Sequence, residues 1–303
     1  MTNAIGVVVT EHIVAGRLAG PVGQQELQGE VLRFPEDPND SEALIGLPTN
    51  ELYELIANLI VELASTSADP IQAIGVAVPG IVRHGVVEDS PNLAQIKGER
   101  MAEALTTVVA RHGIHAPLHV LNDADAVAAG LAAKRGYLDK LTRVWTLGNG
   151  IGYGRWPISD GVWEGGHTVV SLDPKERFCG CGGVGHLEGI MGNRAMRLRF
   201  LDMEPDEVFA AAKAGDPRCR DFVELWHRAL AAATATAIHL GGPGRFYYTG
   251  LNIRFLDKSV LKELLEPMVK MSPLQNYSIE LLPEDPRTAI LGSAVAALRA
   301  DSW

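Results

Sequence analysis

Short apolar runs at the start of the chain predict strands, and the amphipathic stretch after them predicts a helix. Two β-branched runs, Ile5–Val9 and Ile13–Leu18, flank a three-residue polar break and predict a β-hairpin, with Glu30–Phe34 as a further strand. Between Asn50 and Ser65 apolar residues recur every three or four positions, which is typical of one face of a helix. The chain is therefore expected to open with an antiparallel meander and then a helix.

Predicted strands and helices alternate to the end of the chain, which indicates a mixed α/β protein. A second strand–hairpin–helix pattern begins at Val144 and resembles the one that begins at Ile5. Two such copies predict two similar lobes with a cleft between them, a smaller one of residues 1–120 plus 288–303 and a larger one of residues 121–287. Further strands are expected at 73–78, 118–121, 144–147, 168–172, 246–249 and 278–282, and helices at 100–112, 124–134, 186–192, 207–214, 218–240, 258–271 and 289–299, with a turn-rich stretch at 83–93.

Composition narrows the class of protein. The 303 residues allow about two domains, and 47% hydrophobic with 21% charged residues describes an ordinary globular chain. A net charge of -10 argues against a nucleic-acid partner, which would require a basic face. The sequence shows neither a secretion signal nor an apolar run of about 18 residues, so we expect a cytoplasmic protein without a membrane partner. Three cysteines make a disulfide framework improbable.

Metal-ligating residue types gather in one glycine-rich segment, from Glu164 to Glu188. It holds two of the three cysteines and two of the nine histidines of the chain. Thiolate sulfur and imidazole nitrogen at short spacing are what a tetrahedral zinc site requires. The segment therefore predicts a small structural zinc clip, with His167, Cys179, Cys181 and His186 as ligands. The alternative is a pair of ordinary buried thiols with two incidental histidines.

Two other polar segments carry candidate chemistry. Asn122 and Asp123 follow a predicted strand and lead into a helix, which is where α/β proteins place their functional residues. An aspartate there is equally typical of a helix N-cap. The glycine-rich turn Gly148–Gly152 would let backbone N–H groups approach an anion, although such a turn is often no more than a tight hairpin.

These segments occur in the order of the motifs of the ROK family, and the chain resembles that family over nearly its whole length. The ordered set is specific, whereas any single motif is weak. It comprises Gly75-Val-Ala-Val-Pro-Gly80, Ser90-Pro-Asn-Leu93, Asn122-Asp-Ala124, Leu147-Gly-Asn-Gly-Ile-Gly152, Glu164-Gly-Gly-His167, Cys179-Gly-Cys-Gly182 and Leu187-Glu188. The resemblance implies a two-lobed actin-like ATPase (ribonuclease H-like) fold and a homodimer.

The resemblance also implies roles for individual residues. Asp123 would be the general base that accepts the proton of a sugar hydroxyl attacking the γ-phosphate of ATP. His167 would use one ring nitrogen for zinc and the other for the sugar. The sugar-binding set would be Gly80, Asn92, Asn122, Glu164, His167 and Glu188, and the nucleotide-binding set Gly148, Asn149, Gly150 and Gly152 for phosphate with Thr249 and Gly250 for adenosine. An active enzyme would also need Mg²⁺.

The chain departs from the family pattern at four places. His186 replaces the third zinc cysteine, a set that zinc still accepts. The first hairpin, Val7–His12, lacks the family's Asp-x-Gly-Gly-Thr, and Glu11 would bring negative charge towards a polyphosphate. Asn149 replaces the usual Thr, and Thr249-Gly250 replaces a glycine pair. The sugar side is thus nearly intact while every nucleotide-side motif is altered.

Three hypotheses follow from this asymmetry. The first is an ATP- and Mg²⁺-dependent kinase of a hexose or an N-acetylhexosamine. The second is a non-catalytic sugar-binding pseudokinase, and the third is an enzyme with another phosphoryl donor or other chemistry at Asp123. A repressor is disfavoured because the family's repressors carry an amino-terminal helix-turn-helix, and this sequence starts at the kinase-like hairpin. Which sugar is bound stays open.

Overall fold

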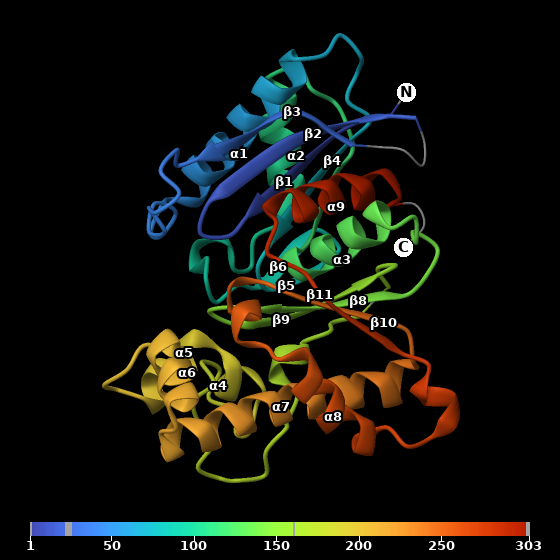
Figure 1. Ribbon diagram of the computed structural model, residues 1–303. Helices are drawn as coiled ribbons and strands as arrows, with labels where there is room; N and C mark the ends of the chain where they lie inside the picture. Colours follow the sequence, from blue (N-terminus) through green and yellow to red (C-terminus); the bar gives the residue numbers. More distant parts are fainter. Residues whose placement is uncertain (1, 22–25, 160, 301–303) are drawn as a thin grey trace. The chain divides into compact units, whose positions relative to one another are not determined.

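The computed structural model describes residues 2–21, 26–159 and 161–300 (Figure 1). Contacts divide the chain into two compact units: unit 1 consists of Met1–Thr142, Gly154–Val162 and Asp285–Trp303, and unit 2 of Arg143–Tyr153 and Trp163–Glu284. The lobe boundaries expected from the sequence stay a prediction. Within the described ranges, no helix is both long and apolar enough to span a membrane.

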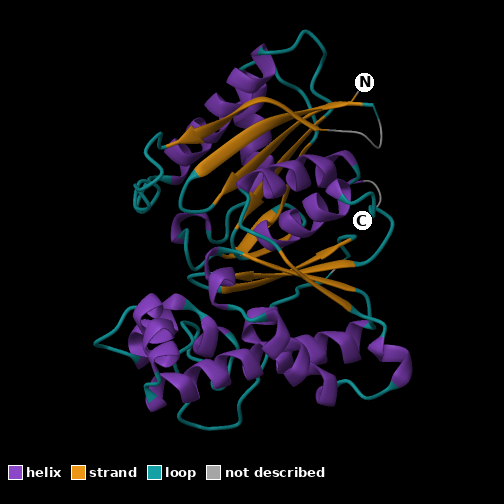
Figure 2. Cartoon of the chain, viewed as in Figure 1, coloured by secondary structure: helices purple, strands orange, loops and turns teal. Residues whose placement is uncertain are grey.

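Unit 1 is built on a five-stranded sheet in the order β3-β2-β1-β4-β7 (Figures 1 and 2). Strands β1 (Thr2–Val9), β2 (Ile13–Gly20) and β3 (Glu26–Phe34) are antiparallel, as the sequence predicted. Strands β4 (Ala73–Val78) and β7 (Leu118–Asn122) are parallel to β1. The carboxyl end of β7 therefore lies at the same edge of the sheet as that of β4.

Helices pack on both faces of this sheet. Ile5, Val7 and Val9 of β1 share a buried cluster with apolar side chains of α1 (Thr49–Ser65) and α2 (Met101–Arg111). The alternate residues face α9 (Pro286–Leu298), where a Cβ on Gly6 would lie only 2.0 Å from the Ile290 carbonyl oxygen. The small residues of β1 are thus what let α9 approach the sheet.

Helix α3 (Asp123–Lys134) packs against α9 at a similarly short distance. A Cβ on Gly130 would lie 1.9 Å from the carbonyl oxygen of Thr288, and one on Gly292 would lie 1.7 Å from that of Ala126. No other residue fits at these two positions without separating the helices. The alanine-rich sequence of α3 serves this close packing, which fixes the helix whose first residue is Asp123.

Unit 2 combines a four-stranded sheet, in the order β11-β10-β8-β9, with five helices. The strands are β8 (Thr142–Leu147), β9 (Ile151–Trp156), β10 (Arg245–Thr249) and β11 (Ser278–Leu281). The helices are α4 (Glu188–Met191), α5 (Asn193–Arg199), α6 (Pro205–Ala214), α7 (Pro217–Gly241) and α8 (Lys258–Met268). They share one core with the sheet, around the buried Trp145, Trp226 and Phe246.

Three expectations from the sequence are wrong. Residues 168–172 form no strand, because only Val169 makes an isolated bridge, to His186. The helix expected at 186–192 is shortened to α4, and α5 follows it directly. The break is at Gly192, whose backbone is extended and where a Cβ would lie 2.8 Å from the carbonyl oxygen of Asn149. The turn-rich stretch contains a small hairpin of β5 (Ile81–Arg83) and β6 (Val86–Asp89).

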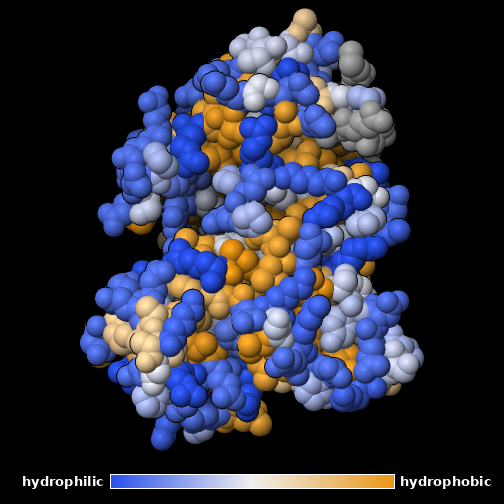
Figure 3. All heavy atoms as spheres, viewed as in Figure 1, coloured by the Kyte–Doolittle hydropathy of each residue, from blue (hydrophilic) through white to orange (hydrophobic). Residues whose placement is uncertain are grey.

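Hydrophilic side chains cover much of the face in Figure 3, and apolar side chains show between them. Several large apolar residues are well exposed, among them Leu172, Leu201 and Leu240. Isolated exposed leucines are normal on protein surfaces and indicate no particular partner.

A buried histidine connects α7 to the start of α8. His227 Nδ1 lies 2.8 Å from the carbonyl oxygen of Val223, and its Nε2 accepts the N–H of Asp257 at 3.0 Å. Asp257 in turn caps α8 through its side chain. Burial lowers the pKa of His227 below its ordinary value. The neutral ring, with its proton on Nδ1, fits both hydrogen bonds.

We predict that His227 makes the protein less stable in mild acid. Because the folded-state pKa is lower than the unfolded one of about 6.5, its contribution is complete above that pH and decreases as pH falls through the folded pKa. His227→Gln should cost about 1–3 kcal/mol at pH 7.5 and weaken the decrease towards pH 5. Urea unfolding at both pH values measures this, with exposed His239→Gln on the same helix as control. An unchanged pH dependence in His227→Gln would contradict the assignment.

Candidate functional site

Asn122 and Asp123, at the N-terminus of α3, have different roles. Asn122 is the N-cap, because its Oδ1 accepts the N–H groups of Ala124 at 2.8 Å and Asp125 at 3.2 Å. Its Nδ2 donates to the carbonyl oxygen of Gly80 at 2.9 Å. Asp123 is the first residue of the helix and is half-buried. Asp123 Oδ1 also accepts the N–H of Ala124, at 2.9 Å, but the N-cap position that the sequence could have assigned to Asp123 is occupied by Asn122.

Gly80 lies where two segments of unit 1 meet. Its φ is 108°, and a Cβ there would lie 2.1 Å from the carbonyl oxygen of Asp89. Ser90 Oγ donates to the carbonyl oxygen of Pro79 at 2.9 Å, which holds the two segments together. Asn92 follows in an exposed loop. Unit 1 therefore places Gly80 beside Asn122 and beside the segment that carries Asn92.

A cavity of about 510 Å³ lies beside β7 in unit 1. Polar residues in its wall include Arg83, His84, His119, Asn122 and Asp125. Asp125 Oδ1 also accepts the N–H of Arg155 at 2.8 Å. No local sequence pattern indicates this cavity, because its wall combines residues from four separate segments.

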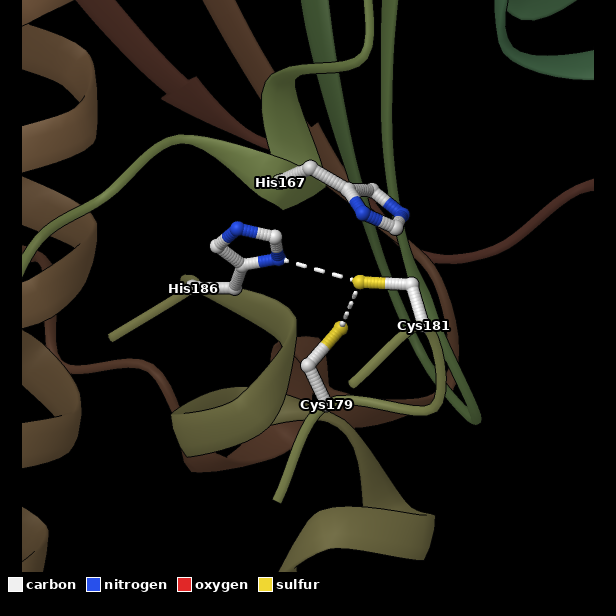
Figure 4. Close-up of side chains that lie close together, drawn as sticks. All are labelled: His167, Cys179, Cys181 and His186. Carbon is white, nitrogen blue, oxygen red and sulfur yellow. Dashed lines mark hydrogen bonds between the residues drawn. The ribbon is translucent and has the colours of Figure 1, made fainter. Parts of the chain in front are cut away.

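The four predicted metal ligands converge in unit 2 (Figure 4). Residues 168–170 lie along 185–187, with the N–H of Leu187 donating to the carbonyl oxygen of Thr168 at 3.0 Å, and this brings His167 and His186 together. Cys179 Sγ lies 3.4 Å from Cys181 Sγ, which lies 3.2 Å from His186 Nδ1. All four donor atoms lie within 4.8 Å of one another.

This geometry fits a zinc ion. Bonds of about 2.3 Å to sulfur and 2.0 Å to nitrogen place tetrahedral donor atoms roughly 3.3–3.8 Å apart. Burial raises the pKa of Cys179 to about 12 and lowers that of His186. Without a cation the site therefore favours a neutral thiol, and a bound cation would favour the thiolate. Cys2His2 is a common zinc set, so His186 in place of a cysteine keeps the site chemically competent.

Two carboxylates flank the cluster. Glu164 Oε2 lies 3.8 Å from His167 Nε2, a position that can orient the imidazole ring. Glu188 Oε1 lies 3.8 Å from Cys179 Sγ, while its Oε2 accepts the N–H of Ile151 at 3.0 Å. Glu188 therefore connects the metal cluster to the turn between β8 and β9.

That turn is the predicted phosphate-binding segment. Gly148 and Gly152 are half-exposed, and Asn149 and Gly150 are exposed. A Cβ on Gly150 would lie 2.8 Å from Glu188 Oε2, so a larger residue would disturb the carboxylate. Unit 2 thus brings the turn and the metal cluster together, as Glu164 and His167 also lie against β8 and β9 through Gly165 and Gly166.

The predicted adenosine segment lies against the same turn. Gly250 has a φ of 100°, and a Cβ there would lie 2.6 Å from the carbonyl oxygen of Leu147. Thr249 is buried, and its hydroxyl donates to the carbonyl oxygen of Pro283 at 3.1 Å. Sequence reasoning missed Asn193 and Asn252, which bond to this turn; two buried asparagines carry no periodic signal that would have indicated them.

The first hairpin lacks the residues with which the family motif binds phosphate. It closes through Thr10, Glu11 and His12, with the Thr10 N–H donating to the carbonyl oxygen of His12 at 2.9 Å. Val8 and Val9 before it are buried, and Glu11 at the turn is exposed. This turn offers neither the aspartate nor the glycine pair of the family motif, as the sequence indicated.

The chain belongs to the ROK family, whose model matches residues 39–284. A glucokinase from Pyrobaculum calidifontis is 29% identical over 197 residues, which are 59% of this chain and 63% of that glucokinase. The match thus covers less than two thirds of the relative. Among solved structures, a ROK hexokinase from Thermus thermophilus has a TM-score of 0.76 at 21% identity, with 100% of both chains covered.

A ROK family glucokinase from Streptomyces griseus, solved with glucose and AMPPNP, has a TM-score of 0.69 at 20% identity and covers 98% of this chain and 99% of its own. These similarities confirm the expected two-lobed, actin-like α/β fold.

We predict different stability effects for Asn122 and Asp123. Asn122→Ala removes the cap and the bond to Gly80 and should cost about 1–2 kcal/mol. Asp123→Asn keeps the Asn122 cap, and its amide oxygen can still accept the Ala124 N–H that Asp123 Oδ1 accepts at 2.9 Å, so the loss of charge at the helix N-terminus should cost under about 1 kcal/mol. Chemical denaturation of both variants measures the difference. A larger loss for Asp123→Asn would show that Asp123, not Asn122, stabilises the start of α3.

Proposed function

We propose that the protein is a sugar kinase that transfers the γ-phosphate of ATP to a hydroxyl of a hexose or an N-acetylhexosamine. The observation that carries this proposal is that Asn122 is the N-cap of α3. The half-buried Asp123 carboxylate is therefore not required as the cap. The glucokinase names of the Pyrobaculum and Streptomyces relatives support the same reaction. Two steps of chemistry follow.

Asp123 acts as the general base. The sugar oxygen forms a bond to the γ-phosphorus while its proton passes to the Asp123 carboxylate, and the bond to the bridging oxygen breaks, leaving its electron pair on ADP. The partial positive charge at the helix N-terminus interacts favourably with this carboxylate. Gly80, Asn92, Asn122, Glu164, His167 and Glu188 bind the sugar.

The turn between β8 and β9 acts on the phosphates. Backbone N–H groups of Gly148, Asn149, Gly150 and Gly152 stabilise charge on the transferred group, and Thr249 and Gly250 bind adenosine. Mg²⁺, if bound with the nucleotide, would supply positive charge that neutralises part of the same negative charge.

We predict that Asp123→Asn lowers kcat by about 10²–10⁴-fold, because it removes the proton acceptor and changes little else. A coupled ADP-release assay with a panel of hexoses and N-acetylhexosamines measures this. Asp125→Asn is the matched control, since its Oδ1 can still accept the N–H of Arg155. Full activity in Asp123→Asn would overturn the assignment.

We further propose that the His167, Cys179, Cys181 and His186 cluster binds one structural zinc ion. The short distances between donor atoms and the fit to a Cys2His2 set support this. Zinc would fix the ring of His167, one of the proposed sugar-binding residues.

We also propose, from the family resemblance, a cytoplasmic homodimer; sedimentation analysis tests the assembly.

We predict one zinc per chain by elemental analysis. His186→Ala should lose the metal and lower the melting temperature, and His186→Cys should retain it, because cysteine is an equally good ligand. Cys219→Ser, at a buried cysteine of α7, is the control and should keep the metal. A folded, metal-free preparation of the unchanged protein would contradict the zinc site.

A second candidate is a sugar-binding protein that does not transfer phosphate. The observation that favours it is the β1–β2 turn, where buried Val8 precedes Thr10, Glu11 and His12 and no aspartate or glycine pair is present. Thermal shift with ATP–Mg²⁺ alone and with sugars alone separates the two, since a ligand stabilises the state that binds it. A shift by sugars but not by ATP would favour this second function.

A further inference from the structure

Three asparagines from separate segments of unit 2 form a hydrogen-bonded chain beside the predicted phosphate turn. Asn252 Nδ2 donates to Asn193 Oδ1 at 2.7 Å and to the carbonyl oxygen of Gly148 at 3.2 Å. Asn193 Nδ2 donates to Asn149 Oδ1 at 3.3 Å, and the Asn193 N–H also donates to Gly148 at 3.1 Å. The Gly148 carbonyl oxygen therefore accepts hydrogen bonds from both Asn252 and Asn193.

The network is buried at one end and exposed at the other. Asn252 is fully buried and Asn193 is 4% exposed, whereas Asn149 is exposed at the turn. Buried amides are rigid when their hydrogen bonds are made, because breaking one leaves a polar group unpaired. The exposed Asn149 is thus attached to a rigid base.

The orientation of the Asn252 amide is unambiguous. Its Nδ2 contacts two carbonyl oxygens, so rotating the amide by half a turn would place oxygen against oxygen. In this orientation Asn252 Oδ1 is buried and has no hydrogen-bond partner among the described residues. An apolar residue at this position would remove the donor to Asn193 Oδ1 and to the Gly148 carbonyl oxygen, so the network requires an amide here.

The backbone brings the same segments together. Gly250 contacts Leu147 closely enough that a Cβ would lie 2.6 Å from its carbonyl oxygen, and a Cβ on Gly192 would lie 2.8 Å from that of Asn149. Asn252 is two residues beyond Gly250, and Asn193 directly follows Gly192. The asparagines therefore connect the predicted phosphate turn to the predicted adenosine segment.

We propose that Asn252, acting through Asn193, is a positioning residue that holds the Gly148–Gly152 turn in the geometry that receives the nucleotide phosphates. This proposal rests on the proposed kinase function. It gives a physical reason for two departures from the family pattern: Asn149 adds a side-chain amide that Asn193 can bond, and the Thr249-Gly250 segment is fixed to the turn through Asn252.

The test is Asn252→Ala, examined in two ways. Amide hydrogen exchange of the ligand-free protein should become faster at residues 148–152 and stay unchanged in β10. In steady-state kinetics the KM for ATP should rise about tenfold, equivalent to about 1.4 kcal/mol, with the KM for the sugar unchanged. A merely structural role would lower the melting temperature without separating the two KM values.

Thr234→Val is the matched control. It removes another buried hydrogen bond of unit 2, that of Thr234 Oγ1 with Tyr248 Oη at 3.0 Å, and does not touch the turn. It should lower stability and leave both KM values and turn exchange unchanged. The proposal is overturned if Asn252→Ala leaves turn exchange unchanged, or if it raises both KM values equally. Absence of phosphate transfer by the unchanged protein would refute the kinase function, while the exchange measurement still decides whether Asn252 holds the turn.

Discussion

The carboxylate of Glu188 connects the parts of unit 2 on which the proposed chemistry depends. One oxygen accepts the N–H of Ile151 in the predicted phosphate turn, and the other lies 3.8 Å from Cys179 Sγ in the proposed metal cluster. The half-buried Glu188 side chain has a contact at each carboxylate oxygen and therefore little freedom to move. Glu188 therefore relates the position of the metal cluster to that of the turn, and a zinc ion in the cluster would affect more than local stability.

In unit 1 the side chain of Asn122 connects two segments in a similar way. It caps α3 and donates to Gly80, so the helix start and the end of β4 are held at a fixed distance. Gly130 of α3 and Gly292 of α9 let the two helices pack in direct contact, which fixes the rest of α3. Asp123 is thus on a helix whose position is fixed at both ends, as the proposed proton transfer would require.

The periodic parts of the sequence predicted most of the fold. The meander, α1, α7 and the strands at 73–78 and 246–249 follow from apolar spacing, because burial selects for it regardless of distant contacts. The failures lie in residues 83–93, where a small hairpin forms, and in residues 168–172 and 186–192. There glycines and metal-ligand residues interrupt the periodicity, and the backbone follows contacts such as that of Gly192 with Asn149, which spacing cannot encode.

The sequence by itself determined which residue types are available: four metal ligands, the polar pair before α3 and the glycine turn. It left open which residue of the pair is the cap, because both asparagine and aspartate suit that position. Tertiary structure decided this through the Asn122 contact to Gly80, and it showed that Asn193 and Asn252 support the turn. Hydrogen bonds between residues 42 to 104 positions apart depend on how the chain is packed, so no local pattern could indicate them.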